Sequence, residues 1–497
     1  MREVATSYPF SLSTFFARVV LGVQSGKQDM LITILNEILK EDKLVIEHPK
    51  RPEILTRCYR SEEIRFGNVL CFADGDGDNR WFWIQTCSLV DGAVIDDVCY
   101  QLHGNTFGDN AVANIGYDLL HRIDTAAYFI KPKVFDGALL SHSRPAHFFY
   151  DQMLNLPLLP ALQDSVISVS ETCFFNPALL GYNTQTKAAG WSIRPQTVPA
   201  NYHVASAFED QLTSWARNNR VDFPPEAFIL WVGVADEKRC WQQQVEGYAS
   251  LITAIHTKIS RQIVVLVDGY TAYAGEEIDV PSEKALFSRL QAEVSVPVQW
   301  VSLIGKDYAT KLRHGVSMTA FATYIGTQSM LPLRFLKSSG VVHSNGVYGS
   351  GLKIAEFPNA RRVPFREVKN VQSSVALKGD YVSYHMPWQS LFNAIVDALN
   401  LNDVELEFIP SLDIFANEED TLNEDPFLAL GERVSTFRQS ADILREVALT
   451  YEAVGDFDTA LKLMSKALEL RPTGKVIISK VEYYRQQIID SQLEGKN

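Results

Sequence analysis

Two side chains suited to proton transfer, His147 and Asp151, lie in the segment SHSRPAHFFYDQ at residues 141–152. They are four residues apart, so on a helix they share one face. The polar residues before them follow an expected strand, and open α/β sheets bind ligands where their strands end. An imidazole or a carboxylate at this position could act as a general base on a hydroxyl group. The alternative is a buried His–Asp hydrogen bond that only holds the helix against the sheet.

A second candidate is an anion site in GVADEKRCWQQQ, at residues 233–244, where Lys238 and Arg239 stand between a strand and a helix. Backbone N–H groups at a helix start bind anions, and two basic side chains would add to them. Basic residues have the wrong sign for a helix N-terminus, which indicates that a bound anion such as a diphosphate compensates them. The alternative is a pair of solvated basic residues.

Further candidates follow other strands of the same region. Small hydroxyl residues and exposed N–H groups between a strand and a short helix suit phosphate contacts. A polar residue at a strand end could bind a ribose or sugar hydroxyl. The residues are Gly326, Thr327, Gln328 and Ser329 in one loop, His343 and Asn345 after the next strand, and Asp268 after an earlier one. Ordinary loop or turn chemistry is the alternative for each of them.

An alternation of apolar strands and helices must position these residues. From residue 227 onward, strands such as AFILWVGV and RQIVVLVDG alternate with amphipathic helices. Their continuous apolar runs indicate a parallel sheet that is covered on both faces. A less regular alternation begins near residue 125, with strands predicted in AAYFI and VFDGALL and a helix in HFFYDQMLNLPLLPAL. The segment 215–226 contains paired prolines and is the predicted linker between the two regions.

We therefore predict an α/β protein with two Rossmann-like domains, at residues 61–220 and 221–400, after a helical segment at 1–60. Within the first domain, the run ADGDGDNRW at 73–81 is expected to be a hairpin turn. It does not fit a calcium-binding loop, because the glycine and the glutamate that such a loop requires are missing.

Residues 425–497 are predicted to form a separate helical domain. Two helices would meet in 448–472 around a tight turn at Gly455. The small residues that would let these helices pack closely are Ala448, Ala460 and Ala467. The pattern resembles a tetratricopeptide repeat. A single repeat cannot bury both faces, so it should dock on flanking helices at 428–440 and 474–490, and these helices offer a surface for a protein partner or for self-association.

Composition limits the remaining function classes. The net charge of −13 weighs against broad binding to nucleic acids or anionic membranes. The six cysteines form no CxxC pair and no metal-ligand spacing with histidine, so we expect reduced thiols and no metal site. The N-terminus lacks signal-peptide features, and no stretch has the length and apolar character of a membrane span. These features predict a cytoplasmic protein, either fully soluble or attached peripherally to the inner membrane.

The arrangement resembles glycosyltransferases of the GT-B type, in which two Rossmann-like domains face each other across a cleft. HFFYDQMLNLPLL, which begins at His147, is similar to a motif of inverting transferases in the family that includes plant xylosyltransferases and related bacterial enzymes. In that motif a histidine opens a helix and a carboxylate follows it. EKRCWQQQVEGY and YIGTQSMLPLRF resemble segments of transferases that build bacterial capsules and O-antigens. The resemblance covers residues 125–350.

This resemblance implies a nucleotide-sugar donor, a glycan acceptor of the capsule or O-antigen type, and inversion at the anomeric carbon. Asp151 or His147 would deprotonate the acceptor hydroxyl. Lys238, Arg239 and the loop at 326–329 would stabilise the departing nucleotide diphosphate. No metal or other cofactor is implied, because basic side chains and helix termini can neutralise the diphosphate.

Three other functions are compatible with the sequence. A nucleotide-sugar epimerase could share the two-domain fold and would act without an acceptor. A transferase that modifies proteins could use the helical hairpin to grip polypeptides. A non-catalytic interaction protein would use the hairpin alone, with the α/β region as its scaffold.

Overall fold

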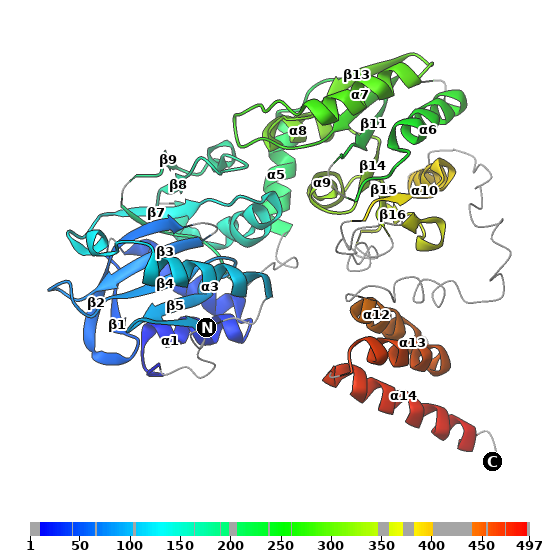
Figure 1. Cartoon of the computed structure of the whole chain (residues 1–497). Coiled ribbons are helices and arrows are strands. Elements are labelled where there is room, and N and C mark those ends of the chain that lie inside the picture. Colours follow the sequence, from blue (N-terminus) through cyan, green and yellow to red (C-terminus); the bar gives the residue numbers. More distant parts are fainter. Residues whose placement is uncertain are drawn as a thin grey trace. The chain divides into compact units, whose positions relative to one another are not determined.

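The computed structural model describes residues 10–41, 43–64, 67–102, 106–163, 165–188, 190–197, 206–236, 239–259, 261–345, 357–370, 382–400, 440–453, 456–472 and 474–494. The protein is of mixed α/β class, with parallel sheets and a C-terminal helical region (Figure 1). The chain divides into two compact units. Unit 1 comprises Met1–Arg220, Thr271–Ile278 and Lys306–Arg313, and unit 2 comprises Val221–Tyr270, Asp279–Gly305 and His314–Asn497. The boundary at Arg220 falls within the predicted linker.

Unit 1 begins with two helices, α1 (Phe15–Gln24) and α2 (Gln28–Lys40), and an antiparallel sheet. The sheet has the order β1-β2-β3-β4-β5-β6, with bounds Val45–His48, Arg51–Ile64, Gly67–Ala73, Trp81–Gln85, Gly92–Ile95 and Val98–Gln101. The prediction of a helical segment over 1–60 is therefore wrong from Val45 onward, and the predicted boundary at residue 61 falls inside β2. Strand β2 pairs in antiparallel hairpins with its neighbours in the sequence, β1 and β3, so strand structure begins well before the predicted domain boundary.

The Gly/Asp run between β3 and β4 forms the predicted hairpin turn. The carboxylate of Asp74 accepts hydrogen bonds from the backbone N–H groups of Asp76 and Asp78, at 3.1 and 2.7 Å, and from the side-chain amide of Asn79, at 2.6 Å. These donors occupy the carboxylate, so Asp74 stabilises the turn.

Both faces of the antiparallel sheet are covered. On one face, helix α3 (Thr106–His121) packs through Ile115 and Leu119. On the other face, Phe16 of α1 lies edge-on to Trp81 and Trp83, with ring centroids 5.0 and 5.4 Å apart. Full burial of one large apolar side chain stabilises a fold by about 1.5–3 kcal/mol. This packing stabilises the sheet and therefore holds the loops at the ends of its strands in position.

The second sheet of unit 1 is parallel and has the order β10-β7-β8-β9. Its strands are β7 (Phe135–Leu140), β8 (Ile167–Val169), β9 (Thr184–Thr186) and β10 (Trp191–Ile193). Every pair is parallel, so the carboxyl ends of all four strands lie at one edge. VFDGALL contains the predicted strand, but AAYFI forms the 3-10 turn η1 (Ala126–Phe129). The carboxylate of Asp124 accepts a hydrogen bond from the N–H of Ala126, which favours a turn over a strand.

The segment after β7 is helical but irregular. It consists of α4 (Pro145–His147), the π-helical turn η2 (Phe148–Gln152) and the 3-10 segments η3 (Met153–Leu158) and η4 (Pro160–Gln163). The predicted continuous helix is interrupted because Pro157 and Pro160 have no N–H to donate. The amide of Gln152 makes hydrogen bonds with both the N–H and the C=O of Ser141, at 3.0 and 2.8 Å. This segment is therefore held to the end of β7.

Unit 2 contains a six-stranded parallel sheet of order β13-β12-β11-β14-β15-β16. The strands are β11 (Phe228–Gly233), β12 (Ile263–Asp268), β13 (Val298–Ser302), β14 (Ala320–Tyr324), β15 (Gly340–His343) and β16 (Ala360–Arg362). The helices of this unit are α6 (Gln244–Lys258), α7 (Pro281–Glu293), α9 (Thr327–Ser329), η6 (Met330–Phe335) and α10 (Trp388–Asn400), while most of α8 (Tyr308–Gly315), which follows β13, belongs to unit 1. Every residue of β11 and β12 is buried, as their apolar runs predict. The predicted alternation of strands and helices from residue 227 is confirmed.

Helices α6 and α10 cover one face of this sheet (Figure 1). Tyr248 of α6 and Phe392 of α10 share one core with Leu230 and Val265 of the sheet. A short antiparallel pair, β17 (Lys369–Asn370) and β18 (Tyr384–His385), lies beside the loop before α6. The backbone of Tyr384 is hydrogen-bonded to that loop through the C=O of Cys240, at 3.0 Å.

Two segments that follow β12 and β13 belong to unit 1. Tyr273, from the first of them, packs on Phe174 with ring centroids 4.7 Å apart. Tyr308, from the second, lies edge-on to Phe149 with ring centroids 4.8 Å apart. These aromatic contacts surround the π-helical turn that carries Asp151.

The C-terminal region consists of α12 (Ser440–Ala453), α13 (Phe457–Leu470) and α14 (Lys475–Glu494). The predicted pair of helices and the flanking helix at 474–490 are confirmed. Ala448, Ala460 and Ala467 have no exposed surface, which allows the close approach of α12 and α13. The side chain of Asp456 caps α13. Gly455 and most of the second flanking helix predicted at 428–440 lie outside the described residues.

Among the helices that the structure describes, none has both the length and the apolar character needed to cross a membrane.

Replacement of Gly137 by Ala tests the pairing of β7 with β8. Gly137 has φ +88°, and an added Cβ would lie 1.8 Å from the carbonyl oxygen of Val166. Gly181 is the matched control, because it has φ +90° but no atom within 4 Å of the added Cβ. Gly181→Ala should lower the free energy of unfolding by about 1–2 kcal/mol through backbone strain alone. Gly137→Ala should lower it by about 3 kcal/mol or more through strain and overpacking. Urea titration measures both, and equal losses would contradict the described packing.

Candidate functional site

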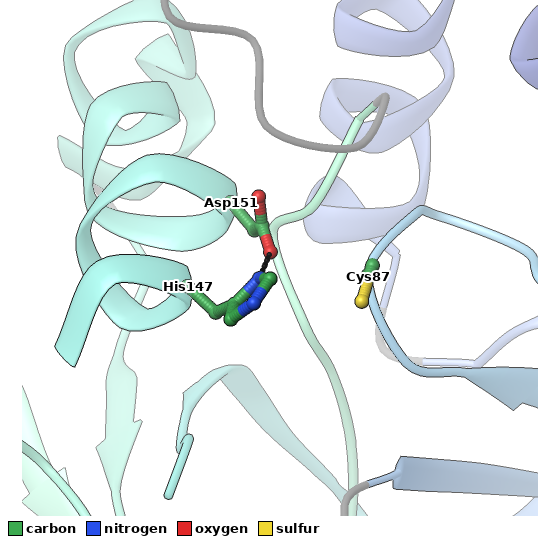
Figure 2. Close-up of side chains that lie close together, drawn as sticks. All are labelled: Cys87, His147 and Asp151. Atoms are coloured by element: carbon green, nitrogen blue, oxygen red, sulfur yellow. Dashed lines mark hydrogen bonds and ion pairs between the residues drawn. The ribbon is translucent and has the colours of Figure 1, made fainter. Parts of the chain in front are cut away.

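His147 and Asp151 form a hydrogen-bonded pair at the end of β7 (Figure 2). His147 Nδ1 lies 2.8 Å from Asp151 Oδ2. Asp151 has no exposed surface, whereas 27% of the His147 side chain is exposed. A buried carboxylate is costly without a hydrogen-bond donor, and the imidazole supplies one. As the acceptor, the carboxylate fixes the proton on Nδ1, so Nε2 carries the lone pair of a general base.

Cys87 lies beside this pair, on the loop that follows β4 (Figure 2). One ligand atom from each of Cys87, His147 and Asp151 lies within 4.8 Å of the others. The carboxylate of Asp91 fixes the loop, because it accepts hydrogen bonds from three consecutive backbone N–H groups, at 2.6, 3.0 and 2.9 Å. The sequence shows no metal-ligand spacing between a cysteine and a histidine, but the fold brings Cys87 close to His147. Sequence spacing could not reveal this cluster, because the antiparallel sheet brings Cys87 to a helix that is distant in the sequence.

The thiol of Cys87 is not an activated nucleophile in the free protein. Burial raises the pKa of Cys87 above its ordinary range, and the carboxylates of Asp91 and Asp151 raise it further. Catalytic cysteines require the opposite environment, one that favours the thiolate. The six cysteines, all of which are described, form no disulfide.

A second group of polar residues, which we call the Glu63 cluster, comprises Glu63, Ser141, Thr172, Lys187 and Arg194. The last four follow β7, β8, β9 and β10, so the parallel sheet gathers them at one edge. Lys187 Nζ lies 2.8 Å and an Arg194 guanidinium nitrogen 3.7 Å from Glu63. The hydroxyl of Ser141 donates a hydrogen bond to Glu63 and lies 3.0 Å from that of Thr172. Glu63 itself comes from β2.

The charged groups of the Glu63 cluster shift one another's pKa values. Burial would raise the pKa of Glu63, but hydrogen bonds from Lys187 and Ser141 and the positive charges of Lys187 and Arg194 outweigh it and hold that pKa below its ordinary range. Arg194 is 2% exposed, and burial lowers its pKa while the charge of Glu63 opposes this effect. The cluster therefore places a fixed carboxylate and two cations near the His147–Asp151 pair.

His142 interacts both with His147 and with Arg194 of the Glu63 cluster. Its ring stacks on that of His147 with centroids 5.0 Å apart, and its Nδ1 accepts a hydrogen bond from the N–H of Arg144 at 2.9 Å. Burial and the positive charge of Arg194 lower the pKa of His142 well below its ordinary value. His142 is therefore neutral and acts as a packing partner for His147.

In unit 2, Arg239, Asp268 and Tyr324 lie near one another at the carboxyl ends of the strands. Burial raises the pKa of Tyr324 above its ordinary range, while the positive charge of Arg239 lowers it and the charge of Asp268 raises it. Arg239 has φ +57°, an unusual backbone conformation for a residue other than glycine. Lys238 lies outside the described residues. Of the two basic residues of the predicted anion site, the structure describes Arg239, and the anion site itself stays a prediction.

The loop at 326–329 is fixed by hydrogen bonds within it and by bonds to the ends of β11 and β12. The amide of Gln328 donates to the carbonyl oxygens of Val234, at 3.0 Å, and Asp268, at 3.3 Å. The hydroxyl of Ser329 accepts from the N–H and donates to the C=O of Gly326, at 3.2 and 3.0 Å. Thr327 is exposed. Of these four residues, Thr327 offers a side chain to a ligand and the others shape the loop.

His343 and Asn345 are buried beneath the same edge of the sheet. His343 Nδ1 lies 2.5 Å from the hydroxyl of Tyr384, and its Nε2 lies 3.1 Å from the hydroxyl of Tyr248. Burial lowers the pKa of His343 to about 3, so the ring is neutral. Asn345 donates to the carbonyl oxygen of Val382 at 2.7 Å. These bonds give both residues a structural role at the positions where ligand contacts were predicted.

No family model matches this chain, and neither does any curated protein.

Glu63→Gln should lower the free energy of unfolding at neutral pH. It should also make that free energy less dependent on pH in the acidic range. A carboxylate with a depressed pKa in the folded state stabilises the fold above its unfolded pKa, and this contribution is lost as the pH falls through the folded pKa. The wild type should lose stability from about pH 5 downward, and the variant should show a flatter profile. At neutral pH the variant should be less stable by about 1–3 kcal/mol, because Arg194 loses its buried counter-charge.

Urea titrations over this pH range provide the measurement. Glu37→Gln is the control, because Glu37 forms an exposed ion pair with Arg18 that should contribute about 0–1 kcal/mol. An unchanged pH profile in Glu63→Gln would show that the cluster does not hold an ionised carboxylate.

Proposed function

We propose that the protein is a glycosyltransferase that moves a sugar from a nucleotide-activated donor to a hydroxyl of a glycan acceptor. The observation that carries this proposal is the His147–Asp151 pair, in which the carboxylate holds the imidazole proton on Nδ1 and so leaves the basic lone pair on Nε2. The pair follows the parallel strand β7, where the sequence predicted a ligand-binding position.

The topology of unit 2 supports a nucleotide-binding role. Numbered from β11, its strand order is 3-2-1-4-5-6, which is the order of dinucleotide-binding Rossmann domains. In such sheets ligands bind at the carboxyl edge where the strand order reverses, here between β11 and β14. Arg239, Asp268 and Tyr324 lie near one another at that edge. We interpret unit 2 as the Rossmann-like donor domain and the four-stranded parallel sheet of unit 1 as a shorter Rossmann-like acceptor domain.

In the proposed reaction, His147 Nε2 takes the proton of the acceptor hydroxyl, and Asp151 stabilises the resulting imidazolium. The acceptor oxygen forms a bond to the anomeric carbon as the bond to the nucleotide diphosphate breaks. Attack from the side opposite the leaving group inverts the anomeric configuration. Arg239, together with Lys238 and the N–H groups after β14, stabilises the negative charge of the diphosphate.

The Glu63 cluster is the proposed acceptor subsite. The side chains of Glu63 and Lys187 are 27% and 21% exposed, so they offer an acceptor and a donor to the hydroxyl groups of a glycan, while the buried Arg194 stabilises the charge of Glu63. The tetratricopeptide-like interpretation of α12 and α13 remains part of the proposal, as a docking element for a partner or a second copy.

Donor binding tests the proposal. A nucleotide sugar should raise the melting temperature of the full chain by mass action, and calorimetry should then give its affinity. Arg239→Gln should weaken donor binding by about tenfold or more, because it removes a charge-assisted contact to phosphate. Arg261→Gln is the control, because Arg261 precedes β12 and lies at the amino end of that strand. No stabilisation by any nucleotide or nucleotide sugar would refute the proposed function.

A further inference from the structure

We propose that Cys87, His147 and Asp151 form a binding site for one transition-metal ion of the Zn²⁺ class. The three ligand atoms lie within 4.8 Å of one another (Figure 2). Thiolate, imidazole and carboxylate are the side chains that bind Zn²⁺, whereas Mg²⁺ and Ca²⁺ prefer sites made of oxygen atoms. Tetrahedral Zn²⁺ would draw the ligand atoms to roughly 3.3–3.7 Å from one another, so a movement of about 1 Å closes the site.

The backbone around the three residues is already ordered for this role. The loop of Cys87 is fixed by Asp91, through the three N–H groups that its carboxylate binds. The turn of Asp151 is fixed by Asn155, whose amide donates to the backbone carbonyl oxygens of Asp151 and Pro195, both at 2.9 Å. Metal ligands depend on such supporting contacts for their orientation.

The burial of the three residues suits a site with one open position. Cys87 is 4% exposed and Asp151 is fully buried, so their contacts with a metal ion would be protected from water. The His147 side chain is 27% exposed, which provides an entry path. Three protein ligands leave the fourth tetrahedral position to solvent or an added ligand.

Charge balance also favours a divalent ion. On binding, the thiol of Cys87 releases its proton to solvent, and the proton of the neutral His147 ring stays on the nitrogen that does not bind the ion, so the site contributes one thiolate, one carboxylate and one neutral imidazole. Two negative charges and Zn²⁺ leave no net charge in the buried site. A bound metal ion would supply positive charge that stabilises the thiolate of Cys87. In the metal-free protein the thiol is not activated, so Cys87 is proposed as a metal ligand and not as a nucleophile.

Metal binding would also prevent His147 from accepting a proton. Zn²⁺ should therefore inhibit sugar transfer, and this consequence, unlike the binding itself, rests on the proposed function.

Cobalt binding by the full chain tests the site without any nucleotide sugar. Co²⁺ occupies Zn²⁺ sites and gives a sulfur-to-metal charge-transfer band when a thiolate binds it. The wild type should show this band, saturating at one ion per chain, and Zn²⁺ should displace it. Cys87→Ser should abolish the band, and the control Cys99→Ser should retain it, because Cys99 lies on β6, where it is partly buried against the core that includes α3.

A second variant covers the case in which Cys87→Ser does not fold. His147→Gln keeps a side-chain N–H that can donate to the Asp151 carboxylate, so the variant should fold, and it should weaken Co²⁺ binding by at least about tenfold. Absence of the band in the wild type, its persistence in Cys87→Ser, or unchanged affinity in His147→Gln would each overturn the proposal. Because no donor is present, these outcomes are independent of the donor-binding test.

Discussion

The buried carboxylate of Asp151 is the constraint on which the candidate site depends. A carboxylate without solvent exposure requires a hydrogen-bond donor, and His147 Nδ1 provides it at 2.8 Å. This bond orients the imidazole and determines which nitrogen can act as a base. The π-helical turn and the amide of Gln152, bonded to the backbone of Ser141, place the pair at the end of β7. Local irregularity in the helix is thus part of how the site is positioned.

The two sheets of unit 1 serve this pair in different ways. The parallel sheet gathers Lys187, Arg194 and Ser141 at the ends of its strands. The antiparallel sheet contributes Glu63 from β2 and Cys87 from the loop after β4. Charges that would be unfavourable alone are compensated within this group, as the lowered pKa of Glu63 indicates.

The sequence predicted the parts of the fold that have local patterns. The apolar runs of β11 and β12, the hairpin turn at Asp74 and the alanines of α12 and α13 all agree with the structure. The pairing of His147 with Asp151 was predictable from their helical spacing. Cys87, Glu63 and Arg194 were missed, because only tertiary structure brings them to the site. Conversely, His343 and Gln328 were predicted as ligand contacts from their strand-end positions, but their hydrogen bonds go to other parts of the protein.

The most direct test of the account is sugar transfer by the Asp151→Asn variant. Labelled nucleotide sugars would be incubated with a glycan extract, and the label in the glycan fraction would be measured. Asp151→Asn should transfer about a hundredfold less sugar than the wild type while it binds the donor equally well, because it removes the group that orients the base. Asp118→Asn, which alters another buried aspartate with a partner four residues away, should retain transfer. Wild-type rates in Asp151→Asn, or no transfer by the wild type from any donor, would contradict the account.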